Sequence, residues 1–362
     1  MISFESDYNT GAHPEILKRL SEKNFEPLSG YGDDKYTKSA KNKIAKLCNV
    51  KSTQVELLVG GTQTNSTVIS TLLKDDEGVI AVDTGHISVH EAGAIEFTGH
   101  KVLTIKGTDG KLSAKDLKEY LKDFYNDSTY LHMVIPGMVY ISYPTEFGTI
   151  YTKNELKEIY KVCKKYKMPL FIDGARLGYG LMSKKSNLSI RDIARFSDVF
   201  YIGGTKVGAF CGEAIVFTKN NKPKNYITSI KKRGALLAKG RLLGIQFDTL
   251  FTKNLYFDIS KYAITMAEKL KNVFKENGFR FYIDSPTNQQ FIVVDNKTLG
   301  KLKRKVAFST WCKLNEKETV IRFVTTWSTK DSDIEYISKV LKNIKGGFHL
   351  KNLIKLGKSS KK

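Results

Sequence analysis

Strand-like and helix-like segments alternate along the chain from about residue 30 to residue 245, and this alternation limits the possible folds more than any other feature. Helical periodicity is found in residues 36–49, 64–73, 88–99, 113–125 and 152–167; short apolar runs that are typical of buried strands occupy residues 54–61, 78–83, 100–106, 131–142, 168–173 and 197–204. Such alternation predicts an α/β fold with a mainly parallel sheet.

The pattern changes after about residue 250. A long helical segment at 258–278 is followed by short strand-like runs at 280–284, 289–295 and 319–327, and by a last helical segment at 331–347. We therefore expect a large domain over residues 1–250, which includes the N-terminal segment. A small C-terminal α+β domain over residues 251–362 is expected to end in the basic tail "LKNLIKLGKSSKK".

Composition narrows the function classes. The 362 residues are 41% hydrophobic and 27% charged, which is ordinary for a globular protein. Four cysteines, Cys48, Cys163, Cys211 and Cys312, show no disulfide or metal-ligand spacing. The chain has no apolar signal core and no run of about 18 uncharged apolar residues. We expect a reduced, cytoplasmic protein that binds neither a metal nor a membrane.

The net charge of +22 raises the possibility of a nucleic-acid-binding protein. However, most lysines are interleaved with acids at helical spacing, as in "KDLKEYLKDF", which is typical of a solvated surface. Without a recognised binding motif, nucleic-acid binding stays a remote alternative, and it predicts steeply salt-dependent association.

Two charged residues follow buried strands: Asp173 in "FIDGAR" and Lys206 in "GGTKVG". Ligands of open parallel sheets bind beyond the carboxyl ends of the strands, so both side chains are candidates for one site. Upstream, "VELLVGGTQTN" leads from a strand through Gly60, Gly61 and Thr62 into a helix, whose N-terminus suits a phosphate. A phosphate site, an aspartate and a lysine together indicate pyridoxal phosphate, with Lys206 forming the Schiff base and Asp173 facing the ring nitrogen.

Several motifs carry a family resemblance in the family's order: "SDYNTGAHP", "YGDDKYTKSA", "GGTQTN", "GHISVHEAGA", "PTEFGTIYTKNELKEI", "FIDGARLGYGL", "GGTKVGAFCGEAIVF" and "IRFVTTW". The chain resembles the low-specificity L-threonine aldolases, in the aromatic amino acid β-eliminating lyase group of fold-type I pyridoxal-phosphate enzymes. The resemblance covers most of the chain and implies a homodimer or homotetramer.

The resemblance assigns roles to residues of this sequence. Gly61 and Thr62 would hold the phosphate, and Arg176 would lie near the phenolic oxygen of the cofactor and the substrate carboxylate. His86 would stack on the cofactor ring and take part in proton transfer. Ser6 and Arg322 would bind the substrate carboxylate, for which the planar guanidinium of an arginine is well shaped.

Three of these residues also allow plainer structural roles: an outward position on an edge strand for Arg322, a helix cap for His86 and a turn for Ser6. His90 lies one helical turn after His86 and is either its partner or a core histidine. Gly174 and Ala175 are expected to stay small so that the turn passes beneath the cofactor.

The chain departs from the family in two places. A second histidine, which the family carries in an "NTHN" stretch near the substrate's β-hydroxyl, is absent from the corresponding "SYPTEFG" of residues 142–148, and His132 is expected in the preceding strand. Ala238 replaces an arginine that the family lends to the phosphate across a dimer, with Lys239 or Arg241 as candidate substitutes.

The resemblance implies retro-aldol cleavage of L-threonine or L-allo-threonine to glycine and an aldehyde, with Lys206, Asp173 and His86 as the catalytic residues. The alternative is a pyridoxal-phosphate-dependent β-eliminating or other carbon–carbon lyase that acts on a different amino acid.

Overall fold

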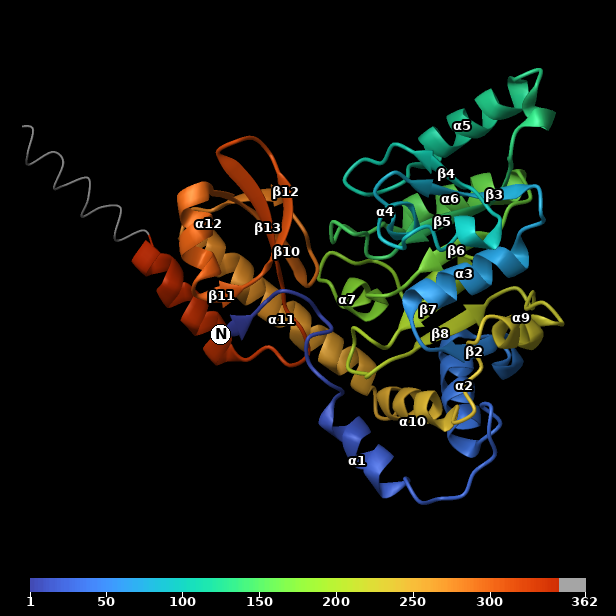
Figure 1. The fold of residues 1–362 in the computed structure, drawn as a ribbon, viewed down its shortest axis with the longest axis horizontal. Coiled ribbons are helices and arrows are strands. Elements are labelled where there is room, and N and C mark those ends of the chain that lie inside the picture. The colour runs from blue at the N-terminus through green and yellow to red at the C-terminus, as the bar shows by residue number, and fades with distance from the viewer. Residues whose placement is uncertain (345–362) are drawn as a thin grey trace, which may run out of the picture. The chain divides into compact units, whose positions relative to one another are not determined.

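The computed structural model describes residues 1–344 and divides the chain into two compact units (Figure 1). The larger unit comprises Gly11–Ser260. The smaller combines Met1–Thr10 with the residues from Lys261 onward. This division differs from the predicted one in two places, since the boundary falls ten residues later and the first ten residues join the C-terminal unit. The basic tail and the end of the last predicted helix lie outside the described residues.

The larger unit is built on a seven-stranded sheet in the order β2-β8-β7-β6-β5-β3-β4. The strands are β2 (Val55–Leu58), β3 (Glu77–Val82), β4 (Val102–Ile105), β5 (Ile135–Ser142), β6 (Leu170–Asp173), β7 (Val199–Gly203) and β8 (Glu213–Phe217). Neighbours from β4 to β7 are parallel, and β8 runs antiparallel to both β7 and β2. The predicted α/β class with a mainly parallel sheet is confirmed.

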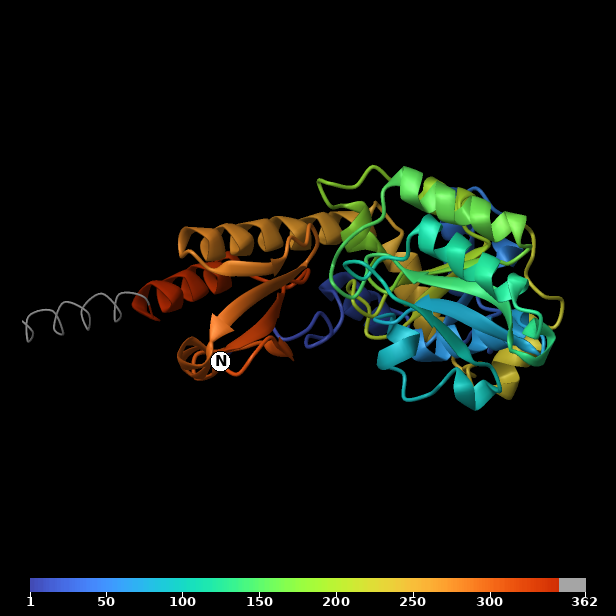
Figure 2. The same ribbon diagram turned by 90° about the horizontal axis from the view of Figure 1, so that it is seen from above.

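Helices cover both faces of this sheet (Figure 2). Their bounds are α1 (Pro14–Glu22), α2 (Lys35–Cys48), α3 (Gly61–Leu72), α4 (His86–Val89), α5 (Ala114–Asn126), α6 (Lys153–Lys165), α7 (Leu177–Leu181), α8 (Ile190–Arg195), α9 (Tyr226–Lys232) and α10 (Arg241–Leu250). Helices α5 and α6 begin at side-chain caps: the Ser113 hydroxyl accepts from the Asp116 amide, and Thr152 forms a capping box with Glu155. Among the helices that the structure describes, none has the length and apolarity to span a membrane.

The helix predicted for residues 88–99 is wrong in most of its length. Helix α4 ends at Val89, and only a 3₁₀ turn (Glu96–Thr98) follows. The backbone takes left-handed φ values of 51° at Ala92, 73° at Gly93 and 91° at Gly99, which a right-handed helix cannot contain. His132 also differs from expectation, because it lies in a 3₁₀ turn (Tyr130–His132) before β5.

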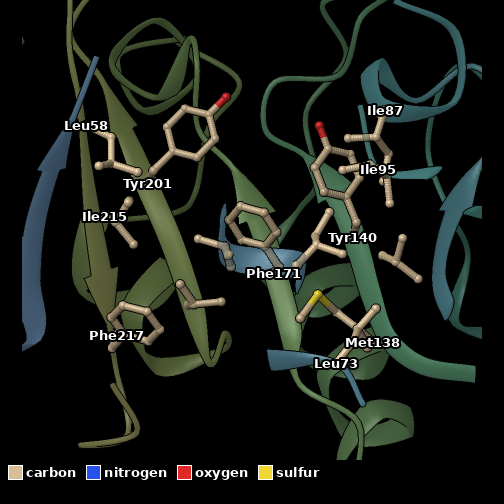
Figure 3. Close-up of a cluster of buried hydrophobic side chains, with 14 of the residues drawn as sticks. Leu58, Leu73, Ile87, Ile95, Met138, Tyr140, Phe171, Tyr201, Ile215 and Phe217 are labelled. Atoms are coloured by element: carbon tan, nitrogen blue, oxygen red, sulfur yellow. The ribbon is translucent and has the colours of Figure 1, made fainter. Parts of the chain in front are cut away.

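One face of the sheet packs against α3 and α9 through a cluster of fully buried side chains (Figure 3). Phe171 of β6 lies at its centre, with Tyr140 of β5 and Tyr201 of β7 on either side (Figure 3). The aromatic rings of both tyrosines are buried, while their hydroxyl groups lie near the carboxyl ends of the strands. The core therefore fixes two hydrogen-bond donors beside the end of β6.

The smaller unit contains a four-stranded antiparallel sheet in the order β12-β13-β10-β9. Its elements are β9 (Arg280–Ile283), β10 (Gln289–Asp295), α12 (Asn296–Lys303), β12 (Ser309–Lys313), β13 (Glu318–Val324) and a helical stretch at residues 331–344. The long helix α11 (Leu255–Glu276) contains the boundary between the units. The N-terminus belongs here because β1 (Ile2–Ser3) pairs in parallel with β11 (Val306–Ala307).

Candidate active site

Asp173, the last residue of β6, is a buried carboxylate surrounded by donors. Oδ2 accepts from the Tyr140 hydroxyl at 2.6 Å and from Asn65 Nδ2 at 3.1 Å; Oδ1 accepts from the Tyr201 hydroxyl at 2.5 Å and from the Ala175 amide at 3.0 Å. Burial by itself would raise the pKa of Asp173, but the charge of His86 and the tyrosine donors outweigh it and hold the pKa below its ordinary value. The carboxylate is therefore held ionised and ready to pair with a cationic group.

The turn after Asp173 is shaped by the neighbouring strand. A Cβ atom on Gly174 would lie 1.9 Å from the Tyr201 carbonyl oxygen, and one on Gly203 would lie 2.2 Å from the Ala175 oxygen. The backbones of β6 and β7 therefore touch at this edge, and only glycine allows it. The β7 backbone is therefore a reason for the small size of Gly174 that holds without any cofactor.

Lys206 lies in the turn that follows β7, at the same edge of the sheet as Asp173. The Tyr179 hydroxyl donates to its carbonyl oxygen at 2.6 Å. The residues just before it are held by Glu213 of β8, whose carboxylate accepts from the Gly204 amide at 3.2 Å and the Thr205 hydroxyl at 3.1 Å. Burial raises the pKa of Glu213 to about 8, although the nearby charge of Lys206 lowers it.

His86 begins α4 and is paired with a fully buried acid. Its Nδ1 lies 2.7 Å from Oε1 of Glu91, and its backbone amide donates to Oε1 of Glu146 at 2.9 Å. Burial favours the neutral imidazole, but the hydrogen bond to Glu91 and the charge of Asp173 outweigh it and raise the pKa of His86. The ring of His90 lies 5.7 Å from that of His86, so His90 contacts its predicted partner.

Three acids of this region, Glu91, Glu146 and Glu213, were not predicted, and neither was Asn65. Glu146 belongs to the "SYPTEFG" stretch that lacks the second histidine; it accepts from the Ser142 hydroxyl at 2.6 Å, and burial raises its pKa. Each of these acids lies in or beside an apolar segment of the sequence. Such a position indicates a buried carboxylate that needs a partner, and this pattern could have identified them.

The start of α3 has the features that a phosphate needs. Gly60 precedes the helix in an extended conformation, and a Cβ atom there would meet no atom within 4 Å. Gly61 and Thr62 open the helix, where backbone amides and the helix dipole favour an anion. The space in front of Gly60 and the chemistry of the surrounding donors fit pyridoxal phosphate.

Arg176 lies three residues after Asp173 and immediately precedes α7, with its carbonyl oxygen accepting from the Gly180 amide. Arg241, one of two candidate substitutes for the missing phosphate arginine, binds within the larger unit instead. Its guanidinium donates to the carbonyl oxygens of Asn24, at 2.8 Å, and of Glu26.

Ser6 and Arg322 belong to the smaller unit. Arg322 of β13 donates through Nη1 to Gln289 at 3.0 Å and through Nη2 to the Ser309 hydroxyl at 3.2 Å and to the Glu5 carbonyl at 3.5 Å. The Ser6 hydroxyl donates to Asn9 at 2.5 Å. The structure thus brings Arg322 next to the segment that carries Ser6, as a shared carboxylate site requires.

A family model described as "Beta-eliminating lyase" matches residues 3–311 of the chain. The chain belongs to the beta-eliminating lyase family. Among curated members, a low specificity L-threonine aldolase from Pseudomonas sp. is 27% identical over 339 residues, 92% of this chain and 95% of that protein. A probable low-specificity L-threonine aldolase from Schizosaccharomyces pombe is 26% identical over 310 residues, 81% of this chain and 75% of that protein.

Solved structures that are similar to this chain support the same family assignment. A threonine aldolase from Leishmania major has a TM-score of 0.91 and 40% sequence identity, covering 95% of this chain and 99% of that one. A histidinol-phosphate aminotransferase from Clostridium acetobutylicum, with a TM-score of 0.72 and 15% identity, covers 96% of this chain and 100% of that one and shows the shared fold alone. The predicted family and the fold-type I architecture of this beta-eliminating lyase family member are confirmed.

Proposed function

We propose that this protein is a pyridoxal-phosphate-dependent aldehyde-lyase that cleaves L-threonine and L-allo-threonine to glycine and acetaldehyde. The observation that carries the proposal is the ionised Asp173 at the same sheet edge as Lys206, with the open N-terminus of α3 in the same unit. The threonine aldolase relatives, above all the one from Leishmania major, supply the substrate class.

Each part of the cofactor has a matching group. Lys206 would hold its aldehyde carbon, Asp173 would pair with its ring nitrogen, and Gly61 and Thr62 at the start of α3 would bind its phosphate. When bound, pyridoxal phosphate supplies an electron sink for the pair released by cleavage of the Cα–Cβ bond.

The protein's own residues have three tasks in this reaction. Arg322 and Ser6 are proposed to bind the substrate carboxylate, and Arg176 is proposed to help orient it through its planar guanidinium. His86 accepts the proton of the β-hydroxyl, directly or through a water molecule. Glu91 orients the His86 ring through Nδ1, so that Nε2 is the nitrogen available for the proton.

The test is an assay of the purified protein for glycine and acetaldehyde from both threonine isomers, together with the absorbance spectrum of the bound cofactor. Wild-type protein is expected to show the cofactor band and release both products in equal amounts. Lys206→Ala is expected to lose the cofactor band and the release of both products. Full activity in that variant would refute the mechanism.

A second candidate function is β-elimination on a different amino acid. The family model's own description and the absence of the second histidine from "SYPTEFG" favour it. It would use the same Lys206, Asp173 and Arg322 but release pyruvate and ammonia. A substrate panel that measures all four products separates the two reactions.

A homo-oligomer in the cytoplasm completes the proposal. Phe25 and Phe97 of the larger unit are 94% and 92% exposed, and contact with a second copy of the chain would remove these apolar side chains from water. Sedimentation of the 40.8 kDa chain as a single monomer would contradict this part. A gel-shift titration with no binding would dismiss the nucleic-acid alternative.

A further inference from the structure

Two buried carboxylates of the larger unit share one donor. Asn65 of α3 is fully buried, and its Nδ2 donates to Oε1 of Glu91 at 2.7 Å and to Oδ2 of Asp173 at 3.1 Å. An amide nitrogen carries two hydrogen atoms, so one Asn can serve both acceptors at once. Glu91 in turn pairs with Nδ1 of His86, which completes a continuous path from His86 to Asp173.

The orientation of the Asn65 amide depends on these two acids. Its Oδ1 is buried and has no hydrogen-bond partner among residues 1–344, which is an unfavourable state for a carbonyl oxygen. The reverse orientation would place that oxygen against two carboxylates and remove both donations. The two hydrogen bonds from Nδ2 to the acids must therefore stabilise this orientation by more than the missing hydrogen bond of Oδ1 costs.

We propose that Asn65 is a positioning residue that links the His86–Glu91 pair to Asp173 and keeps both carboxylates in place for the cofactor. Without a donor between them, the two buried carboxylates repel each other, which displaces Glu91 and favours the protonated form of Asp173. A protonated Asp173 no longer pairs with a cationic ring nitrogen, and a displaced Glu91 no longer orients His86. The inference rests on the proposed function only through the identity of the cofactor.

The first experiment measures the dissociation constant of pyridoxal phosphate on the apoprotein, by titration followed in absorbance. Asn65→Leu keeps the size of the side chain and removes both donors. We expect its dissociation constant to rise about tenfold or more. The matched control is Thr64→Val, on the neighbouring buried residue of the same helix, whose hydroxyl has no partner among the described residues; it should stay within about twofold of wild type.

A double-mutant cycle separates this role from a general loss of packing. Glu91→Gln is expected to weaken cofactor binding in the wild-type background and to add nothing in the Asn65→Leu background, because the path is already broken. Additive effects would overturn the link. So would cofactor binding by Asn65→Leu that matches Thr64→Val.

Asn65→Asp keeps the test decisive if Asn65→Leu fails to fold. The new acid would face Glu91 and Asp173, which are themselves bonded to His86, Tyr140 and Tyr201. Its cofactor affinity is expected to fall with rising pH more steeply than that of wild type, and equal slopes would refute the proposal. If wild-type protein does not bind pyridoxal phosphate, the proposed function fails. If wild-type protein binds it and the Asn65 variants bind it with the same affinity and pH dependence, the inference alone fails.

Discussion

Nδ1 of His86 lies 2.7 Å from Oε1 of Glu91, a carboxylate with no exposure to solvent. An acid in this position fixes the tautomer of an imidazole and stabilises its protonated form. The pair therefore fixes the orientation of the His86 ring and leaves Nε2 as the nitrogen that can accept a proton.

Replacing Glu91 with Gln should lower the pKa of His86, because the hydrogen bond and the charge that raise it are lost. A base works in its deprotonated form, so the acidic limb of the pH–rate profile for aldehyde release should move to lower pH. The maximal rate should fall by about 10²-fold as ring orientation is lost. The exposed Glu96→Gln serves as the control. An unchanged acidic limb in Glu91→Gln would show that His86 is not the titrating base.

Asp173→Asn should reduce cofactor affinity by about 10²-fold or more, since a neutral amide cannot pair with a charged ring nitrogen and the donors around it would face an amide group. The readout is the pyridoxal phosphate dissociation constant. Asp83→Asn, at the end of β3, tests a carboxylate at another strand end, whose Oδ1 accepts from the Gly107 amide. Equal affinities for the two variants would exclude the assigned role of Asp173.

Glu213→Gln should change how stability depends on pH. The folded-state pKa of Glu213 is raised to about 8 from an ordinary value of 4.5, so between these values the folded protein binds more protons than the unfolded chain. Stability of the wild type therefore falls as pH rises through this window. The variant should lack this loss and be more stable relative to wild type at pH 9 than at pH 5. Parallel thermal-unfolding curves at both pH values would contradict the raised pKa.

Asp248→Ala should destabilise the larger unit by about 3 kcal/mol, because two cations then lose a largely buried partner. Asp248 of α10 accepts from Arg19 of α1 and from Ser39 and Lys43 of α2, each at 2.6 Å. For comparison, Lys38 and Asp33 form an exposed pair, and Lys38→Ala should change stability much less than Asp248→Ala. Chemical denaturation measures both, and equal costs would contradict the role of Asp248.

Part of this site is visible in the sequence, because the geometry of a parallel sheet dictates it. Asp173 ends β6 and Lys206 lies in the turn after the adjacent β7, so their common edge follows from the topology of the sheet. The glycines before Thr62 mark the beginning of a helix. Asn65 escaped notice because its contact with Asp173 spans 108 residues of sequence and depends on side-chain direction. No local pattern encodes such a contact.

The errors have local causes. The segment after His86 has helical apolar spacing, yet α4 ends at Val89 and Ala92 and Gly93 adopt left-handed conformations that a continuous helix cannot contain. Gly174 has a steric requirement that the sequence does not show, because a Cβ atom there would lie 1.9 Å from the Tyr201 carbonyl oxygen.

The most direct test of the account is the product balance of the purified wild-type protein with L-threonine and L-allo-threonine, measured beside Lys206→Ala. The account predicts glycine and acetaldehyde in equal amounts from the wild type and neither product from the variant. Pyruvate or its homologues with ammonia, and no glycine, would contradict it.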